Sequence, residues 1–542
     1  MAEREAVLAG GPGVNRPAAA LQITAVAPTA KSPWIIAISV MLATFMEVLD
    51  TAIASVALPY IAGSLSASTD EATWVLTSYL VANAIVLPAS NWFAMRIGRK
   101  RFFILCVAIF TASSFACGAA PTLSFILMAR ILQGAGGGAL QPLSQSILLE
   151  SFPPEKRGVA MAVFGFGVVC APVLGPTLGG WLTDTYSWRY AFYINIPVGI
   201  LAILLIGRFV QDPPHMRGSK SISFDGIGLG ALVVWIGCLQ IILDKGQEDD
   251  WFGAIWIRWA ALLFVVSFVW FVWHSWRSEH PLVNLRVLKN WNFAVGCVLI
   301  LIFGISIYST VTVLPLFYQE LLGYTAFTAG MVVAPRGVGS IVAMPLIANL
   351  SEWIDARYLL TFGFVLFAVT TLYMGSVTTA ISPWTLLIPI LVTGFGVGFI
   401  FVPISTQAYG TLPRDQIGAA SGLYNLMRNI GGSIGVSLTA TLLARRSSAH
   451  QSEMTNYMPR SGQQFQSALQ TQMGALGNHF GLAHAQYPAE LQLYRQLQYQ
   501  ATDWAFVDVF RWLALLCMAG AGIVWLFKRV QKGRPPAGAG AH

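Results

Sequence analysis

The stretch GAGGGALQP, residues 134–142, matches the stretch GFGVGFIFVP, residues 394–403, in the spacing of its glycines. An offset of 260 residues, without any gap, superposes Gly134, Gly136 and Gly138 on Gly394, Gly396 and Gly398. The same offset pairs residues 152–158 (FPPEKRG) with 412–418 (LPRDQIG), Ala160 with Ala420, and Gly175 with Gly435. A register kept over about forty residues indicates an internal duplication.

Composition identifies the chain as a membrane protein. Of its 542 residues, 56% are hydrophobic and only 10% are charged, and the mean hydropathy is +0.64; an average soluble domain has about 25% charged residues. Almost every apolar segment exceeds the roughly 17 residues that a membrane-spanning helix needs. The segments are 34–58, 72–94, 102–120, 123–149, 158–181, 189–208, 226–243, 256–275, 293–318, 327–350, 358–378, 384–410, 418–443 and 505–527. Their lengths do not fit the short alternating strands of an outer-membrane barrel, so we predict an all-α membrane protein with fourteen transmembrane helices.

The duplication organises these helices into two halves. It pairs the fourth and fifth predicted helices with the twelfth and thirteenth, a displacement of eight, which two six-helix halves separated by two inserted helices would give. Parallel repeats of this kind build transporters whose halves rock about a central site. The predicted divisions are a flexible cytoplasmic N-terminal tail (1–32), the first six-helix bundle (33–209), a linker with two inserted helices (210–276), the second bundle with an outward loop at 445–504 (277–530), and a cytoplasmic tail (531–542).

Basic residues concentrate in every second loop, which the positive-inside rule places in the cytoplasm together with both termini. They are Arg96, Arg99, Lys100, Arg101, Lys156, Arg157, Arg208, Arg217, Lys220, Arg277, Arg286, Lys289, Lys528, Arg529, Lys532 and Arg534. This placement explains the net charge of +8 by topology and gives no indication of nucleic-acid binding.

The sequence offers no familiar catalytic or metal chemistry. All six cysteines fall inside predicted spans without CxxC spacing, so disulfides and zinc sites are not expected. There is no GxxxxGK[ST] loop, HExxH or GxSxG motif, which argues against ATP hydrolysis and against common hydrolase chemistry. We therefore expect a secondary transporter without a cofactor or metal, driven by a proton gradient.

Candidate functional charges inside the predicted spans are Glu47, Asp50, Arg130, Arg336 and Arg428. Each costs on the order of 3 kcal/mol near the bilayer centre and is a functional candidate for that reason. Glu47 and Asp50 are three residues apart and share one helix face. A carboxylate that faces the two sides of the membrane in turn can load a proton on one side and release it on the other. The alternatives are a static Asp50–Arg130 pair and, for Glu47, a role in cavity lining.

The second half carries candidate substrate contacts. Arg336 and Arg428 could hold an anionic substrate group or neutralise the acids of the first half, or could only satisfy backbone carbonyls opened near Pro335 and the glycines. With Glu47, the aromatic residues Tyr308 and Phe399 are candidates for lining the substrate cavity.

Two further features concern contacts between helices and with partners. The GxxxG pairs Gly175/Gly179 and Gly431/Gly435 allow close helix packing, and we expect them to seal a rocking interface between the halves. Residues 445–504 are polar and Gln-rich, and the topology places them outside. They are interpreted either as a partly helical surface insert or as a docking surface for another protein.

Several motifs resemble those of one family. Similar stretches are LDTAIASVALPYI (49–61) on helix 1, NWFAMRIGRKR (91–101) in the second loop, RILQG around Arg130, APVLGPTLGG (171–180) on helix 5, and WRYAFYINIPVG (188–199) on helix 6. Together they resemble the fourteen-span drug:proton antiporters of the major facilitator superfamily, of the EmrB-type multidrug exporter branch. Departures are Asn91 and Met95 for the usual Gly and Asp of the loop motif, and Ala171 for a Gly of the helix 5 motif.

The resemblance implies proton-coupled export of hydrophobic or amphipathic drugs across a bacterial inner membrane. Asp50 with Glu47 would carry the proton and Arg130 would couple it to motion. The implied gating residues are Arg96, Gly98, Arg99 and Lys100 on the cytoplasmic side and Gly175, Pro176, Gly179 and Gly180 at a sealing bend of helix 5. The implied partners are membrane lipids, a periplasmic adaptor protein and an outer-membrane channel. A dedicated exporter of one metabolite, such as a fatty acid or siderophore, is the alternative.

Overall fold

The computed structural model describes residues 32–153, 156–212, 225–351, 353–376, 383–457, 459, 461–480 and 485–529. The predicted tails, except Ser32, lie outside these residues, as does most of the linker before the inserted helices. Within the described ranges the regular secondary structure is entirely helical, as predicted.

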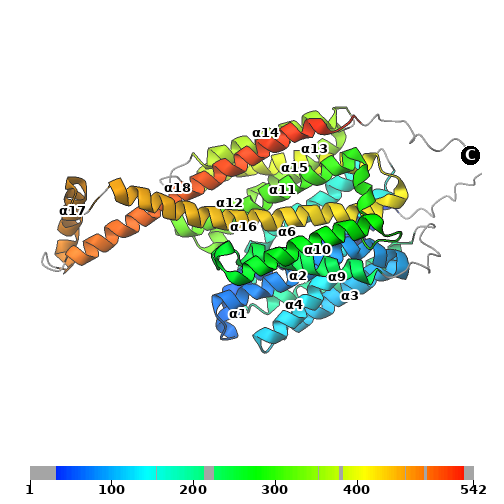
Figure 1. Ribbon diagram of the computed structural model, residues 1–542, viewed down its shortest axis with the longest axis horizontal. Helices are drawn as coiled ribbons and strands as arrows, with labels where there is room; N and C mark the ends of the chain where they lie inside the picture. The colour runs from blue at the N-terminus through cyan, green and yellow to red at the C-terminus, as the bar shows by residue number, and fades with distance from the viewer. Residues whose placement is uncertain are drawn as a thin grey trace, which may run out of the picture.

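The helices run almost parallel to one axis of the molecule (Figure 1). Those of the first bundle are α1 Pro33–Ser64, α2 Thr69–Ile97, α3 Arg99–Gly118, α4 Leu123–Gly137, α5 Leu140–Ser151, α6 Arg157–Thr185, α7 Tyr190–Tyr193 and α8 Asn195–Phe209. The inserted pair is α9 Gly226–Lys245 and α10 Ile255–Arg277. The second bundle holds α11 Trp291–Leu316, α12 Ala326–Val333, α13 Pro335–Leu350, α14 Ala356–Met374, α15 Leu387–Gly410, α16 Ile417–Tyr457, α17 Gln463–Phe480 and α18 Gln486–Ile523.

Thirteen helical segments among the described residues are long and apolar enough to cross a membrane. The remaining predicted segment, 418–443, lies in α16, which packs against α2, α5, α11 and α18. Polar residues of this stretch, such as Asn425 and Arg428, face the protein interior and lower its hydropathy. The structure is therefore consistent with fourteen spans, although α16 is not among the thirteen that length and composition identify.

The duplication is visible in the packing. A Cβ at Gly134 would lie 2.3 Å from a backbone oxygen of α2, and one at Gly136 would lie 2.8 Å from a backbone nitrogen of α3. In the second half, a Cβ at Gly394 would likewise lie 2.0 Å from a backbone oxygen of α13, and one at Gly396 would lie 3.3 Å from a backbone oxygen of α14. Thus α4 is inserted between α2 and α3 as α15 is inserted between α13 and α14, which confirms the repeat read from the glycines.

One predicted span, 123–149, is divided into α4 and α5 by a turn at Gly138 and Ala139. Pro142 follows directly, and a proline ring clashes with the carbonyl four residues earlier, here that of Gly138. The predicted span 327–350 is likewise divided, into α12 and α13, at Pro335.

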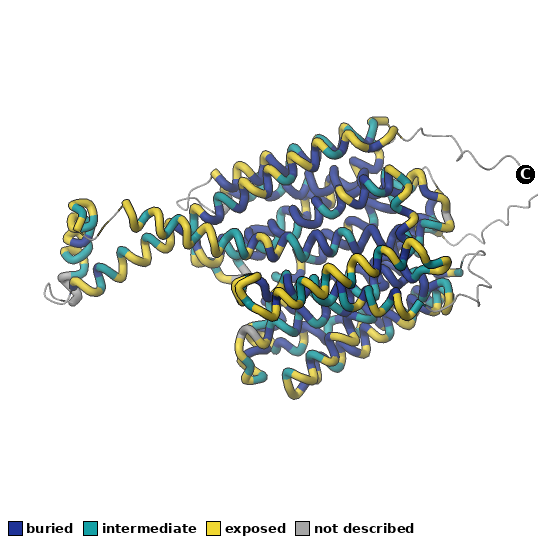
Figure 2. Tube along the Cα trace, in the orientation of Figure 1, coloured by how far each residue is buried: buried dark blue, intermediate teal, exposed yellow. Residues whose placement is uncertain are grey.

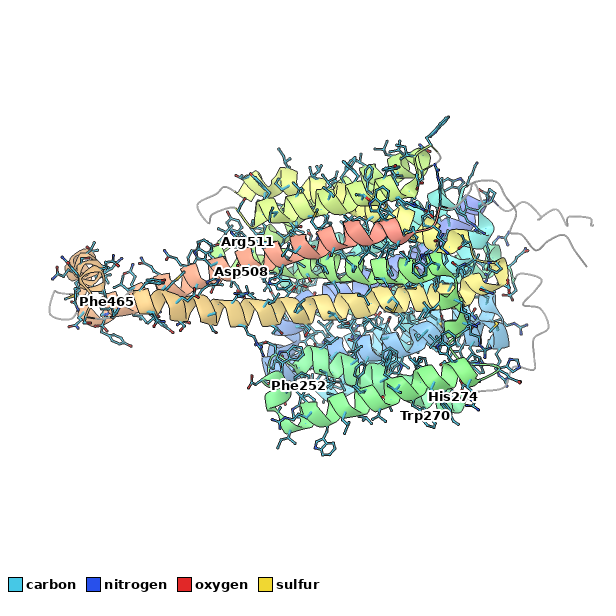
Figure 3. The ribbon with its side chains drawn as sticks, turned by 45° about the horizontal axis from the view of Figure 1, so that its top comes forward. Phe252, Trp270, His274, Phe465, Asp508 and Arg511 are labelled. Carbon is cyan, nitrogen blue, oxygen red and sulfur yellow. The ribbon has the colours of Figure 1, made fainter. Side chains whose placement is uncertain are left out.

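The inserted helices form a hairpin on the outside of the bundle. α9 and α10 pack on each other through Trp235 and the Phe264, Phe268 and Phe271 rings, and α9 also contacts α2 and α16. His274 Nε2 of α10 lies at hydrogen-bond distance, 2.8 Å, from Oδ1 of Asp225, the residue that caps the N-terminus of α9. Trp270 and His274 lie on this outer helix in Figure 3.

The outward segment 445–504, for which one interpretation was a partly helical surface insert, is largely helical in the part that the structure describes. α16 continues to Tyr457 and α18 already begins at Gln486, so both transmembrane helices extend beyond the bundle and carry α17 at their far end (Figures 1 and 3). These outer parts are mostly exposed (Figure 2). Asp508 of α18 holds the two helices together, because it lies 2.9 Å from His450 Nε2 and 3.6 Å from Arg446 Nε of α16. We call residues 445–504 the projecting arm.

The glycine pairs do not seal the two halves against each other as predicted. A Cβ at Gly175 or Gly179 would contact Ala52 or Ile53 of α1, whereas Gly431 and Gly435 face α11. Each pair therefore joins two helices of its own half. Small residues in a membrane helix indicate close contact with the backbone of another helix, but the sequence alone does not identify that helix.

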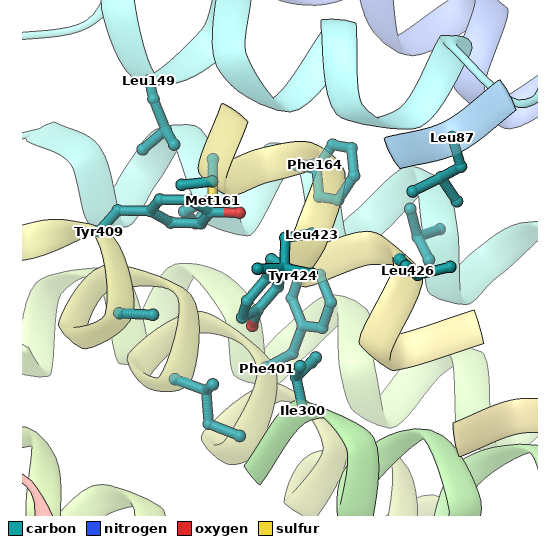
Figure 4. Close-up of a cluster of buried hydrophobic side chains, with 14 of the residues drawn as sticks. Leu87, Leu149, Met161, Phe164, Ile300, Phe401, Tyr409, Leu423, Tyr424 and Leu426 are labelled. Carbon is teal, nitrogen blue, oxygen red and sulfur yellow. The ribbon is translucent and has the colours of Figure 1, made fainter. Parts of the chain in front are cut away.

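The halves meet instead around α6, α13 and α15. Aromatic side chains fill this contact: Phe164 of α6 stacks on Phe401 of α15 with ring centroids 6.0 Å apart, and Tyr409 and Tyr424 lie 5.3 Å apart nearby (Figure 4). A Cβ at Gly158 would lie 3.8 Å from Ala348 of α13 at one end of α6. The two halves are thus in contact through a continuous apolar core.

Candidate functional site

A buried ion pair lies at the centre of the first half. Arg130 of α4 donates to Asp50 of α1 at 2.6 Å, and both side chains are fully buried. The other oxygen of Asp50 accepts from Gln133 at 2.9 Å and from Asn195 at 2.6 Å. Three hydrogen bonds and one full charge thus compensate the carboxylate for lost water, as a buried charge requires.

Arg130 is fixed by further contacts. Its Nε donates to the Val75 carbonyl of α2 at 2.9 Å, and a terminal nitrogen donates to Gln133 at 2.8 Å. The guanidinium also lies over the Tyr79 ring, 4.3 Å from its centroid, in a cation–π contact. The predicted Asp50–Arg130 contact is therefore present and ties α1, α2 and α4 together.

Glu47 lies one turn away on the same helix and has a different environment. It accepts from Tyr79 at 3.2 Å, from Asn83 at 3.1 Å and from Gln141 at 2.6 Å. Its side chain is buried, and among the described residues no cation lies within ion-pair distance. Its hydrogen-bond donors are all neutral, and the Arg428 guanidinium beyond Gln141 adds an electrostatic attraction without forming an ion pair.

The two carboxylates belong to one network. Tyr79 donates its hydroxyl to Glu47 and supports Arg130 with its ring, so a change at either acid is felt by the other. Gln141 extends the network to the second half, because its Oε1 accepts from Arg428 of α16. The network thus runs from Asp50 to the interface between the halves.

The second-half arginines lie apart from the acids. Arg428 reaches Glu47 only through Gln141, and Arg336 donates to Thr310 of α11 at 2.5 Å. Both are buried, and in each the Nε and one terminal nitrogen have no partner among the described residues. Neither forms an ion pair with Glu47 or Asp50 in the described part of the chain.

The two aromatic candidates lie in different surroundings. Tyr308 of α11 is half-buried against Gly432 of α16 and lies within electrostatic range of Glu47 and Arg428. Phe399 packs between α15 and α14, with its ring 5.0 Å from that of the exposed Phe362. The structure thus brings Tyr308 close to the polar network and places Phe399 in a helix contact near the outer surface.

The predicted gating residues at 96–100 form a tight turn between α2 and α3. Gly98 has φ +95°, a conformation that other residues rarely adopt. The amide of Lys100 donates to Asp212 at 2.7 Å, and Arg99 pairs with Glu150 at the end of α5 at 2.8 Å. Arg96 lies over the Trp92 ring at 5.7 Å. Although Met95 replaces the usual acid, the turn is thus tied to α5 by Glu150.

Two observations place this turn at the interface. A Cβ at Gly418, at the start of α16, would lie 2.2 Å from Asn91 Oδ1 of α2. Deeper inside, Ser421 donates to the Pro142 carbonyl at 3.1 Å and Asn425 donates to Gln145 at 2.6 Å. α5 and α16 therefore form a row of polar contacts from the centre towards the Gly98 turn.

The bend of α6 contacts the second half near the opposite end. A Cβ at Gly330 of α12 would lie 3.6 Å from Pro176 and 3.4 Å from Thr177, whereas Gly180 has open space beside it. The two halves therefore touch near both ends of α6 in this structure.

Sequence reasoning missed the uncharged members of the network, Tyr79, Asn83, Gln133, Gln141 and Asn195. The signal that could have found them is their position: each is a polar residue inside an apolar segment, and all five side chains are buried. Among the described residues there is no cluster of His, Cys, Asp and Glu that could hold a metal ion.

Two similar helical halves, the first of which contains two buried, hydrogen-bonded carboxylates, define a multi-pass membrane transporter of the alternating-access type. Comparison with known proteins agrees: the sequence profile of the Major Facilitator Superfamily matches residues 40–436, and the chain belongs to this superfamily.

Its relatives include proteins named for multidrug export and for resistance. It is 35% identical over 511 residues to the multidrug export protein EmrB of Escherichia coli K12, which covers 93% of this chain and 96% of the relative. It is 38% identical over 424 residues to the fatty acid resistance protein FarB of Neisseria gonorrhoeae, covering 78% and 83%. The human organic anion transporter MFSD10 shares the fold, with a TM-score of 0.58 at 14% identity over 90% of this chain and 100% of that one.

Proposed function

We propose that the protein is a proton-coupled exporter of hydrophobic or amphipathic small molecules. The observation that carries this proposal is the network in which Asp50 and Glu47 are buried side by side in one half and linked through Gln141 to the other. The relatedness to multidrug export proteins supports export as the direction of transport.

In this mechanism Asp50 and Glu47 exchange protons with one side of the membrane at a time. Proton entry weakens the interaction of Asp50 with Arg130, because a neutral carboxyl no longer attracts the guanidinium, and the freed hydrogen-bond groups favour a rearrangement of α1 against α4. Each proton that moves inward releases about 2.3 kcal/mol per 100 mV, and this free energy drives the substrate outward.

We place the protein in the bacterial inner membrane with both termini in the cytoplasm, from the alternation of basic loops. The projecting arm then stands on the outer side, where an adaptor protein leading to an outer-membrane channel could bind to it. Deletion of residues 458–484, which keeps the transmembrane parts of α16 and α18, tests this role: the proposal requires loss of adaptor binding in a pull-down from membranes that express both proteins.

The decisive experiment is substrate-induced proton release from purified protein in liposomes. Tetraphenylphosphonium, a lipophilic cation, and oleate, an amphipathic anion, serve as probes. We expect release with wild type and none with Asp50→Asn, and normal release with Asp508→Asn, the same change in α18 of the second half, away from the network of Asp50 and Glu47. Release that is unchanged in Asp50→Asn would make the Asp50–Arg130 pair structural and leave Glu47 as the carrier.

A dedicated exporter of one anionic metabolite is the second candidate. The unpartnered N–H groups of Arg336 and Arg428 favour it, since a carboxylate could satisfy them, and a fatty acid resistance protein is among the relatives. Proton release with oleate and not with tetraphenylphosphonium would favour this candidate over multidrug export.

A further inference from the structure

Gln141 connects the carboxylate of one half to an arginine of the other. Its Nε2 donates to Glu47 Oε2 at 2.6 Å, and its Oε1 accepts from the Arg428 guanidinium. All three side chains are at most 5% exposed. A single amide on α5 therefore bridges α1 and α16 through the protein interior.

The chemistry at its two ends fixes the orientation of this amide. A guanidinium can only donate hydrogen bonds and an ionised carboxylate can only accept them, whereas an amide has one donating and one accepting end. With Glu47 ionised, Nε2 must face Glu47 and Oε1 must face Arg428. The bridge is therefore complete only in this protonation state.

Protonation of Glu47 removes this fit. Tyr79 and Asn83 already donate to Oε1, so a proton is accommodated best on Oε2, where it faces the Gln141 amide group. To accept it, the amide must turn its oxygen towards Glu47, which directs Nε2 at Arg428. Two donors then face each other, and a buried donor without an acceptor is unfavourable.

We propose that Gln141 is a positioning residue that couples the protonation of Glu47 to contact between the halves. With Glu47 ionised, the bridge holds α5 against α16 and closes the end of the bundle that contains the Gly98 turn. With Glu47 protonated, the bridge is lost and this end opens. This proposal rests on the proposed proton coupling and assigns it a specific link.

The order of events suits export. An outward-facing protein would take up a proton from outside, lose the bridge, and open the end near Gly98 to the cytoplasm. The charged and titratable groups that face Glu47 are Tyr79 of α2, Tyr308 of α11 and, through Gln141, Arg428; Asp50 and its partner Arg130 lie one turn away. Among the described residues Gln141 is the group that contacts both Glu47 and Arg428.

The same helix provides a matched control. Gln145, one turn after Gln141, also joins the halves, because its Oε1 accepts from Asn425 at 2.6 Å and from Tyr409 at 3.1 Å. Its Nε2 contacts the Met161 sulfur and not a carboxylate. Gln145→Met thus removes a contact between the halves without touching Glu47.

The experiment measures the distance between the halves as a function of pH. Spin labels are placed at Arg101→Cys on α3 and Trp353→Cys after α13, both exposed, with the partly exposed Cys238 replaced by serine. Distances are recorded by pulsed electron paramagnetic resonance on the full chain in lipid nanodiscs, without substrate. Arg101 follows the Gly98 turn, and Trp353 follows Ala348, which packs against the start of α6 beside α5, so both labels report on the same end.

In the wild-type background we expect a short distance at high pH and a longer one at low pH. Gln141→Met should show the longer distance at every pH, whereas Gln145→Met should keep the pH-dependent shift. Glu47→Gln, which mimics the protonated acid and folds without the need to bury a charge, should also show the longer distance throughout.

A pH-dependent shift that persists in Gln141→Met, or in Glu47→Gln, would overturn the proposal. So would a wild-type distance that does not change with pH. Proton release in liposomes is measured on the same variants. Release in wild type without a distance change would refute the bridge while the proposed function stands, and absence of release would refute the function.

Discussion

In the first half a buried arginine, Arg130, faces a carboxylate, whereas in the second half a buried arginine, Arg336, faces the hydroxyl of Thr310. Thr310 lies 260 residues after Asp50, which is the offset of the duplication. The glycine contacts of the two halves match, but their charges do not. The duplication therefore keeps the packing that both halves need to fold, and the buried carboxylates of the described residues, Glu47 and Asp50, lie in the first half.

This asymmetry fits the proposed transporter, in which one half binds and releases protons and the other half changes its contacts in response. In the proposed mechanism a proton changes the charge at Glu47 or Asp50, and the described residues connect Glu47 to the charged Arg428 of the second half through Gln141. The arginines of the second half are permanently charged and cannot be switched by pH in the physiological range.

The largest expected effect compares the two arginines directly. Arg130→Met leaves Asp50 buried without its cation and should lower the free energy of unfolding by roughly 3–5 kcal/mol. Arg336→Met removes one hydrogen bond and two unpartnered donors, so its effect should be about 1 kcal/mol or less, of either sign. Thermal unfolding of the two variants in the same detergent measures the difference.

The double variant Asp50→Asn, Arg130→Met is the control, because it removes both charges and should recover part of the loss. Equal destabilisation by Arg130→Met and Arg336→Met would show that the two halves are electrostatically alike after all.

The second prediction concerns what the halves share. Gly134→Ala and Gly394→Ala each place a methyl group within 2.3 Å of a backbone oxygen of the neighbouring helix. Both should destabilise the protein by roughly 1–3 kcal/mol, because the backbones must separate. Gly180→Ala, with open space beside it, is the control for the substitution itself. A large effect in one half alone would contradict the equivalence of the repeats.

These comparisons show how far the sequence predicts the fold. The glycines at 134 and 394 identified the duplication because small residues mark close backbone contacts, which both halves retain. The helical character of 445–504 was only one of two interpretations, because hydropathy indicates where a helix leaves the bilayer and not where the helix ends. α16 and α18 simply continue as polar helices outside the membrane.

The site was only partly predictable for a similar reason. Charges such as Glu47 and Arg130 stand out within apolar segments because they are costly there. Gln141 and Asn83 are less costly, and their importance depends on what lies opposite them. Only the arrangement of α1, α2, α5 and α16 in space shows that one amide contacts both Glu47 and Arg428.

A smaller effect is expected at the turn between α2 and α3. Gly98→Ala places a Cβ in a backbone conformation with φ +95° and should cost about 1–2 kcal/mol. Gly207→Ala, in a helix with a nearest neighbour at 4.0 Å, is the matched control. A loss of transport in Gly98→Ala that is larger than its loss of stability explains would give the turn a role in transport. We expect such a role because the turn carries Arg99, which pairs with Glu150 of α5.

The smallest effect concerns the projecting arm, which only the second half carries. Asp508→Asn removes the negative charge that holds Arg446 and His450 of α16 near α18. These groups are partly exposed, so the loss should be below about 1 kcal/mol and should decrease in high salt. The global unfolding temperature should therefore hardly change, whereas amide hydrogen exchange in residues 445–457 and 486–504 should become faster. Because the partners of Asp508 are Arg446, His450 and Arg511 and not the carboxylates of the first half, proton release should stay normal, and a loss of release in this variant would mean that the arm is mechanically coupled to those carboxylates.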